Sequence, residues 1–129
     1  MKVCEGRISS QFGYRTHPVT GQKNSFHSGV DIAAPAGTPV ICPVDGTATL
    51  VATGPIGGKQ VIVRKGDTEY IFLHLSEQCV TEGARVRLSS LIGKVGATGR
   101  VTGPHLHFGI RINGQYVNPA PYIEFDGMA

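Results

Sequence analysis

The clearest strand pattern in the sequence is Pro104-His105-Leu106-His107-Phe108-Gly109-Ile110-Arg111-Ile112-Asn113-Gly114. Its apolar residues alternate strictly with histidine, glycine and arginine, which is the period of a β-strand buried on one face. The Asn-Gly pair at its end is a strong signal for a type I′ hairpin turn. We therefore expect Gln115–Val117 to return as an antiparallel partner strand.

Strand patterns of the same kind recur along the chain and are separated by turn residues. They cover Thr47–Val51, Gln60–Arg64, Glu69–Leu75, Ala84–Leu88 and Leu91–Val95. Eighteen glycines and eight prolines are scattered through the 129 residues. Because these residues cost roughly 1 and 3 kcal/mol in a helix interior, a helical bundle is excluded. No repeat or change of composition divides the chain. We expect one all-β domain over residues 1–129, a glycine-rich antiparallel sheet with little or no helix.

The charge and the cysteines exclude several classes of function. The formal net charge is +3, and no run of basic residues is longer than Arg64-Lys65, so no nucleic-acid partner is expected. The apolar stretches are too short and too broken for membrane insertion. Cys4, Cys42 and Cys79 lie far apart and form neither a metal motif nor a disulfide framework, so they are interpreted as small buried or idle thiols. A monomer is expected.

Four of the five histidines lie in strand-like patterns, and the first pair is His105 and His107. In a strand these two imidazoles point to the same face, with Cα atoms roughly 6.6–7 Å apart. Gly109 follows on that face and leaves room for a ligand to approach. The alternative is a pair of partly exposed surface histidines.

The second pattern is His27 with Asp31, four residues apart. A straight strand would separate them by about 13 Å, which is too far for one metal ion. If they share an ion, the backbone must bend, and Ser28-Gly29 is where a bend is least costly. A surface salt bridge explains the same spacing.

The third pattern places His74 in an alternating strand. There it shares a face with Tyr70 and Phe72, and Ile71, Leu73 and Leu75 take the other face. The alternative is a half-buried strand histidine without a chemical role.

Taken together, these residues match the needs of metal-dependent hydrolysis. Two histidines, one aspartate and a water form an open tetrahedral Zn²⁺ site of the catalytic type. Two further imidazoles could transfer protons and stabilise an oxyanion. The competing cysteine–histidine nucleophile has no local support, because no cysteine shows a sign of activation. The spacing leaves open which histidine of the His105/His107 pair would bind the metal.

The sequence resembles the lysostaphin/LytM-type zinc endopeptidases over about residues 6–123. The similar stretches are Phe12–Gly21, Phe26–Val40, Leu73–Leu75 and Thr98–Phe108, which ends in the highly specific Pro-His-Leu-His-Phe block. The resemblance implies one Zn²⁺ per chain, with His27, Asp31 and His107 as ligands and His74 and His105 as catalytic histidines that do not bind the metal.

The resemblance also implies a fold and a substrate. The metal would lie at the floor of a narrow groove, with loops Thr16–Asn24 and Gly96–Gly103 as walls. The enzyme would cleave peptide bonds of bacterial peptidoglycan, in the stem, the cross-link or the bridge. Activity should be lost at low pH, because protons displace metal from imidazole.

We therefore expect action in the cell wall, in the periplasm or outside the cell. No apolar stretch with a cleavage site follows Met1-Lys2, so no signal peptide is expected. Delivery by a phage particle, release by lysis as an endolysin, or origin as a fragment of a longer exported protein would each account for that.

Two alternatives belong to other classes of function. One is a non-catalytic wall-binding domain that activates another hydrolase, against which the intact ligand set argues. The other is a biotinyl or lipoyl carrier domain. Lys59, Lys65 and Lys94 lie near turns, but none is in a recognisable acceptor context.

Overall fold

The computed structural model describes residues 2–15, 25–122 and 124–126, and these residues contain strands and turns but no helix. The predicted loop wall Thr16–Asn24 lies outside the described residues. The all-β fold with little or no helix is confirmed. The strands are β1 (Lys2–Ser10), β2 (Gly13–Arg15), β3 (Ser25–His27), β4 (Val30–Ala33), β5 (Pro39–Ile41), β6 (Gly46–Gly54), β7 (Gly58–Lys65), β8 (Thr68–Gln78), β9 (Arg85–Val86), β10 (Leu91–Val95), β11 (His105–Ile112), β12 (Gln115–Val117) and β13 (Glu124–Asp126).

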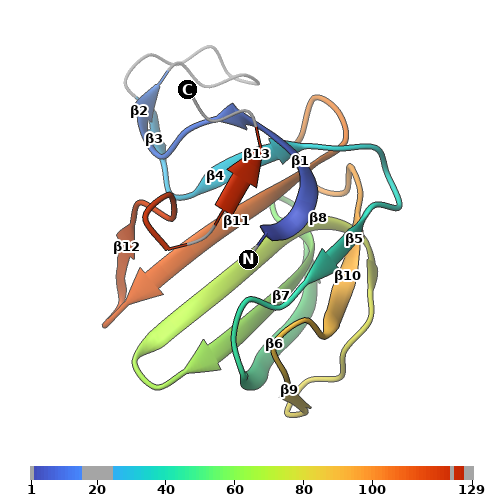
Figure 1. Cartoon of the computed structure of the whole chain (residues 1–129). Helices are drawn as coiled ribbons and strands as arrows, with labels where there is room; N and C mark the ends of the chain where they lie inside the picture. Colours follow the sequence, from blue (N-terminus) through green and yellow to red (C-terminus); the bar gives the residue numbers. More distant parts are fainter. Residues whose placement is uncertain (1, 16–24, 123, 127–129) are drawn as a thin grey trace.

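Most of these strands belong to one curled sheet, in the order β13-β1-β4-β11-β8-β7-β6-β9. Strands β4, β11, β8 and β7 run side by side through the centre of the molecule (Figure 1). Strand β10 joins the sheet through β8 and carries β5 at its other edge, and β2 and β3 form a separate hairpin. The pairings are antiparallel, as expected, except that β1 and β13 run parallel.

The hairpin between β11 and β12 has the predicted geometry. Asn113 and Gly114 both have positive φ, 49° and 80°, as a type I′ turn requires. Ile112 pairs with Gln115 across the two-residue turn. This turn chemistry fixes the register at one end of β11.

The alternation in β11 places its apolar side in the core, also as predicted. Leu106, Phe108 and Ile110 have no exposed surface. The Phe108 ring packs against Phe72 of β8 with ring centroids 5.2 Å apart. Because one face of β11 is anchored in this way, His105, His107, Gly109 and Arg111 are held on the opposite face.

Strand β8 does not alternate as predicted, because it bulges at His74. Phe72 and Leu75 are both fully buried, so the core positions are three residues apart rather than two. His74 has φ 67°, and its ring lies beside His105 and His107. The expectation that His74 shares a face with Phe72 is therefore wrong: the bulge inserts a residue and turns His74 to the histidine face.

The predicted strand Ala84–Leu88 shortens to β9, Arg85–Val86. The chain turns immediately afterwards, because Ser89 has φ 72° and the Leu88 N–H donates to Asp45 Oδ1 at 2.7 Å. A backbone N–H that donates to a side chain in this way is not available for pairing with a neighbouring strand, so the strand ends earlier than predicted.

The three cysteines form no disulfide, and Cys4 and Cys42 are buried in the core as expected, whereas Cys79 is half-buried. The described residues contain no helix that is long and apolar enough to span a membrane.

An ion pair on the histidine face gives a pH-dependent contribution to stability. Arg111 donates from Nε and Nη2 to the two carboxylate oxygens of Glu69, at 2.8 and 3.0 Å. This hydrogen bonding lowers the pKa of Glu69 from its ordinary 4.5. The contribution is present above that value and is lost as the pH falls below it.

We expect Glu69→Gln to lower the free energy of unfolding by about 1 kcal/mol at pH 7, since the pair is only partly buried. The difference from wild type should shrink as the pH falls below 4.5 in chemical denaturation. Glu77→Gln, which breaks the exposed pair with Lys94, is the matched control and should change stability less. A Glu69→Gln difference that does not change between pH 7 and pH 3 would contradict the assignment.

Candidate metal centre

His27 and Asp31 are brought together by a bend between β3 and β4. Strand β3 ends at His27 and β4 begins at Val30, with Ser28 and Gly29 between them. The bend is at the predicted position. A Cβ on Gly29 would lie 2.3 Å from the Phe108 carbonyl oxygen, so glycine is needed there because the backbone of β11 passes so close.

Asp31 meets His107 through the register of β4 and β11. The two residues are direct partners across this antiparallel pair. Directly opposed residues point to the same face of a sheet. Since the other face of β11 is the core, the carboxylate and the imidazole both point away from it.

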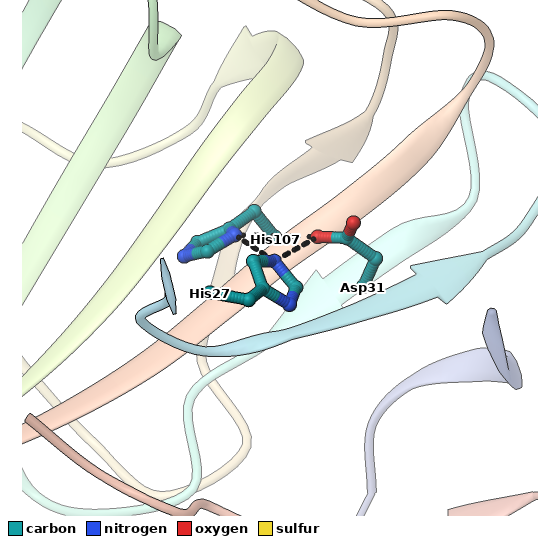
Figure 2. A group of neighbouring side chains, drawn as sticks. All are labelled: His27, Asp31 and His107. Carbon is teal, nitrogen blue, oxygen red and sulfur yellow. Dashed lines mark hydrogen bonds and ion pairs between the residues drawn. The ribbon is translucent and has the colours of Figure 1, made fainter. Parts of the chain in front are cut away.

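The three side chains converge on one point (Figure 2). His27 Nε2 lies 3.1 Å from Asp31 Oδ1 and 3.1 Å from His107 Nδ1, and His107 Nδ1 lies 3.2 Å from Asp31 Oδ1. His27 and Asp31 come from one local bend, whereas His107 lies 80 and 76 positions away from them in the chain. This is the one group of possible ligands within the described residues that could hold a metal ion.

The triangle has the size and chemistry of a zinc site. Zinc bonds of about 2.0–2.1 Å in a tetrahedron place neighbouring ligand atoms about 3.3–3.4 Å apart. Two imidazole nitrogens and one carboxylate oxygen are a donor set typical of catalytic zinc. The residues present therefore fit the metal that the sequence predicts.

The tautomer of His27 is set by a backbone carbonyl. His27 Nδ1 lies 2.9 Å from the Gln11 carbonyl oxygen, which can only accept a hydrogen bond. Nδ1 of the neutral ring therefore carries the proton, and the lone pair of Nε2 points into the triangle. Such an outer hydrogen bond orients a metal-binding imidazole.

The surroundings of Asp31 favour its ionised form. Burial by itself would raise the pKa of Asp31, but hydrogen bonds to His107 and His27 and their charges outweigh it and hold this pKa far below its ordinary value. Burial lowers the pKa of His107. An ionised carboxylate and an imidazole whose protonation is disfavoured are the forms of these side chains that bind a metal.

His74 and His105 lie next to the triangle rather than in it. Their rings are 5.0 Å apart, and the His74 ring is 6.2 Å from that of His107. His105 Nε2 is 3.6 Å from Asp31 Oδ1, longer than the distances within the triangle. The structure thus brings all five predicted site residues together and groups His107 rather than His105 with His27 and Asp31.

Both of these histidines carry their proton on Nδ1. His74 Nδ1 donates to the Thr98 carbonyl at 2.9 Å, and His105 Nδ1 donates to the Gly103 carbonyl at 3.0 Å. Burial lowers the pKa of His74 to about 4, although the bond to Thr98 partly offsets it. Their Nε2 atoms are therefore bare in the neutral rings.

Sequence reasoning missed the three carbonyls that fix these tautomers. They belong to Gln11, Thr98 and Gly103, and a backbone carbonyl leaves no signature in side-chain chemistry. Thr98 and Gly103 do fall within the predicted wall Gly96–Gly103, so the segment was identified but not its contact with the histidines.

The two glycines beside the site differ in how closely they are approached. A Cβ on Gly109 would find nothing nearer than the Ser28 carbonyl oxygen at 3.5 Å, an ordinary contact. A Cβ on Gly109 would thus fit among its protein neighbours, and the room that Gly109 leaves for a ligand stays a prediction. At Gly29 a Cβ would meet Phe108 at 2.3 Å and His107 Nε2 at 2.9 Å.

We expect Gly29→Ala to lower the free energy of unfolding by about 1–3 kcal/mol, because the crowding must be relieved by moving β4 away from β11. The same shift should weaken metal binding. Gly109→Ala is the matched control and should change stability by less than about 0.5 kcal/mol. Thermal unfolding with and without added zinc measures both effects, and equal losses in the two variants would contradict this account.

Comparison with known proteins places these residues in a family. The sequence model of Peptidase family M23 matches residues 25–119. Over 114 residues the chain is 48% identical to the DD-carboxypeptidase/endopeptidase Mpg of Neisseria meningitidis serogroup B, covering 88% of this chain and 26% of that protein. It is 44% identical over 116 residues to the peptidoglycan DD-endopeptidase ShyC of Vibrio cholerae, again covering 88% of this chain and 26% of that protein.

Solved structures agree with the sequence comparison. The catalytic domain of lysostaphin from Staphylococcus simulans superposes with a TM-score of 0.82 at 28% identity, covering 91% of both chains. A zinc-containing peptidase from Vibrio cholerae gives a TM-score of 0.81 at 36% identity, covering 92% of this chain and 36% of that one. The chain spans about a quarter of the length of the curated relatives named above. Since the family match covers most of the chain, the predicted relationship is confirmed: the chain belongs to the metallopeptidase family M23, to which it is joined by sequence and by fold.

Proposed function

We propose that this chain is a zinc-dependent endopeptidase domain that hydrolyses peptide bonds in bacterial peptidoglycan. One observation carries the proposal: three buried ligand atoms from His27, Asp31 and His107 lie within 3.2 Å of one another beside two further histidines. Membership of family M23 and the names of the relatives, peptidoglycan DD-endopeptidases among them, support the same reaction class.

In this proposal His27, Asp31 and His107 hold one Zn²⁺. When bound, the ion supplies a Lewis acid and lowers the pKa of a bound water to about 7. The three ligands are at most 7% exposed, so bulk water is largely kept from their side chains. Electrostatic interactions are stronger in such an environment.

His74 and His105 move protons and stabilise charge. In the neutral form each ring has a bare Nε2, because Nδ1 donates to a backbone carbonyl. A bare Nε2 can take a proton from the attacking water and return it to the nitrogen of the departing amine. The same N–H, once formed, can donate to the oxyanion of the tetrahedral intermediate. His74, with its pKa lowered by burial to about 4, is neutral at pH 7.

The bond that we propose as substrate is the DD-type cross-link between stem peptides. This finer assignment rests on the names of relatives that are 44% and 48% identical to the chain. The site of action would be the cell wall, and the whole chain would act as one catalytic domain.

Hydrolysis of purified wall fragments tests the proposal. Wild-type protein should release monomeric stem peptides from DD-cross-linked dimers, as measured by mass spectrometry, and should lose this activity on chelation and regain it on addition of zinc. His27→Ala and His105→Ala should both be impaired. Equal activity in all three proteins would overturn the proposal, and a zinc-free folded wild type without hydrolysis would favour the wall-binding alternative. A substrate with a glycine bridge in place of the DD bond tests the finer assignment.

A further inference from the structure

His74 lies where β8 changes its neighbour. The pairing of β8 with β11 ends at Leu73, opposite His107, and the pairing with β10 begins at Leu75, opposite Val95. His74 falls between the two ladders and adopts φ 67°. A left-handed conformation costs a non-glycine residue roughly 1–2 kcal/mol, so its surroundings must hold it there.

The surroundings that hold His74 come from two turns. Its N–H donates to the Gly57 carbonyl at 2.8 Å, between β6 and β7. Its Nδ1–H donates to the Thr98 carbonyl at 2.9 Å, in the segment between β10 and β11. The backbone and the ring of His74 are thus each fixed by a different turn.

Thr98 ties these elements together through its hydroxyl group. Thr98 Oγ1 donates to the Leu75 carbonyl at 2.6 Å, immediately after His74, and accepts from the Lys59 N–H at 3.0 Å. Thr98 therefore contacts the His74 ring through its carbonyl oxygen. Through its hydroxyl group it contacts the residue that follows His74 in β8 and the beginning of β7.

The two turns also interlock through glycines. A Cβ on Gly58 would lie 2.3 Å from the Thr98 carbonyl carbon, and one on Gly99 would lie 2.3 Å from the Ile56 carbonyl oxygen. The Arg100 N–H donates to that Ile56 oxygen at 2.8 Å. Contacts between backbones leave little room for movement, so the position of the Thr98 carbonyl is well defined.

We propose that Thr98 is the positioning residue for His74: its hydroxyl fixes the turn whose carbonyl sets the tautomer and the orientation of the imidazole. The inference rests on the proposed function, in which His74 handles a proton. The contacts of Thr98 described above do not include His27, Asp31 or His107, so positioning of His74 is separate from metal binding.

Substitution of Thr98 by valine and by serine tests the role. Valine keeps the shape of threonine but removes the hydroxyl, whereas serine keeps the hydroxyl. We expect Thr98→Val to bind zinc with wild-type stoichiometry and to lose about 10–100-fold in kcat, as misplacement of a reacting group does, with KM changed by less than about threefold. Thr98→Ser should recover most of that loss.

Nuclear magnetic resonance gives a readout that does not depend on activity. Long-range ¹H–¹⁵N correlations of the His74 ring, assigned by their loss in His74→Gln, should show the Nδ1–H tautomer in wild type and in Thr98→Ser. In Thr98→Val they should show a mixture of tautomers. A Thr98→Val protein with wild-type kcat and the wild-type His74 pattern would overturn the inference.

Two glycine variants approach the same contact from the opposite side. Gly58 and Gly66 have nearly the same φ, 65° and 62°, but a Cβ on Gly66 would meet nothing within 4 Å. Gly58→Ala should reproduce the kcat loss and the tautomer change of Thr98→Val, and Gly66→Ala should lower stability without either effect. Equal loss of kcat in both alanine variants would trace the effect to general destabilisation and would refute the role of Thr98.

The tests separate this inference from the proposed function. If the wild type hydrolyses no wall peptide, the proposed function fails, and the tautomer comparison still decides whether Thr98 positions His74. If wild type is active but the His74 pattern is the same in all variants, the inference fails while the proposed function stands.

Discussion

Asp31→Asn is expected to remove zinc from the protein and to reduce hydrolysis of wall peptides by at least about 10³-fold. Asp31 supplies the negative charge of the triangle, and its Oδ1 lies 3.1 Å from His27 Nε2 and 3.2 Å from His107 Nδ1. A neutral amide keeps the size of the side chain but not its charge. A bound metal contributes several kcal/mol of transition-state stabilisation, and about 4 kcal/mol corresponds to 10³-fold.

Asp67→Asn is the matched control for this experiment. Asp67 lies in the exposed turn between β7 and β8, away from the triangle, and its variant makes the same change from carboxylate to amide. Its variant should keep wild-type zinc content and activity. Metal analysis of the purified proteins, followed by hydrolysis assays at saturating zinc, separates weak binding from lost chemistry. Full zinc content in Asp31→Asn after dialysis would contradict the assignment of Asp31 as a ligand.

The second large effect is expected for His105→Ala, which should keep its zinc and still lose about 10²–10⁴-fold in kcat. The ring of His105 lies outside the triangle, with Nε2 at 3.6 Å from Asp31 Oδ1. Removing it should therefore leave the three proposed ligands in place. What is lost is an imidazole that can exchange a proton or stabilise an oxyanion.

His107→Ala provides the comparison for His105→Ala. The two residues lie on the same face of one strand, two positions apart, so their variants make the same chemical change at neighbouring positions of that face. We expect zinc to be lost from His107→Ala only. Zinc loss from His105→Ala with retention in His107→Ala would show that His105, not His107, binds the metal. The spacing of the two residues in the sequence does not distinguish these two possibilities.

Much of the fold could be predicted because local patterns were strong. The alternation through Leu106, Phe108 and Ile110 identified the buried face of β11, and that face is fully buried. Asn113-Gly114 identified its turn, and both residues have the positive φ that the turn needs. The bend between His27 and Asp31 could be placed because glycine is the residue that permits the close approach to Phe108.

Other features could not be predicted because they depend on distant partners. The bulge at His74 arises where β11 gives way to β10 as the neighbour of β8, and nothing in the local alternation indicates it. The parallel pairing of β1 with β13 joins residues near opposite ends of the sequence. The choice of His107 over His105 came from the resemblance, because a strand places both imidazoles on one face and only the register with β4 distinguishes them.

That register has a consequence for which changes in chain length the domain can accept. Asp31 faces His107 only because Val30 faces Phe108 one step away, with its own side chain buried. A single-residue insertion within β4 would exchange these faces, burying the carboxylate in the core and presenting valine to His107. Insertions in the exposed turns leave the pairing intact. Metal binding by these three side chains therefore requires the correct register between β4 and β11, which are distant in the sequence.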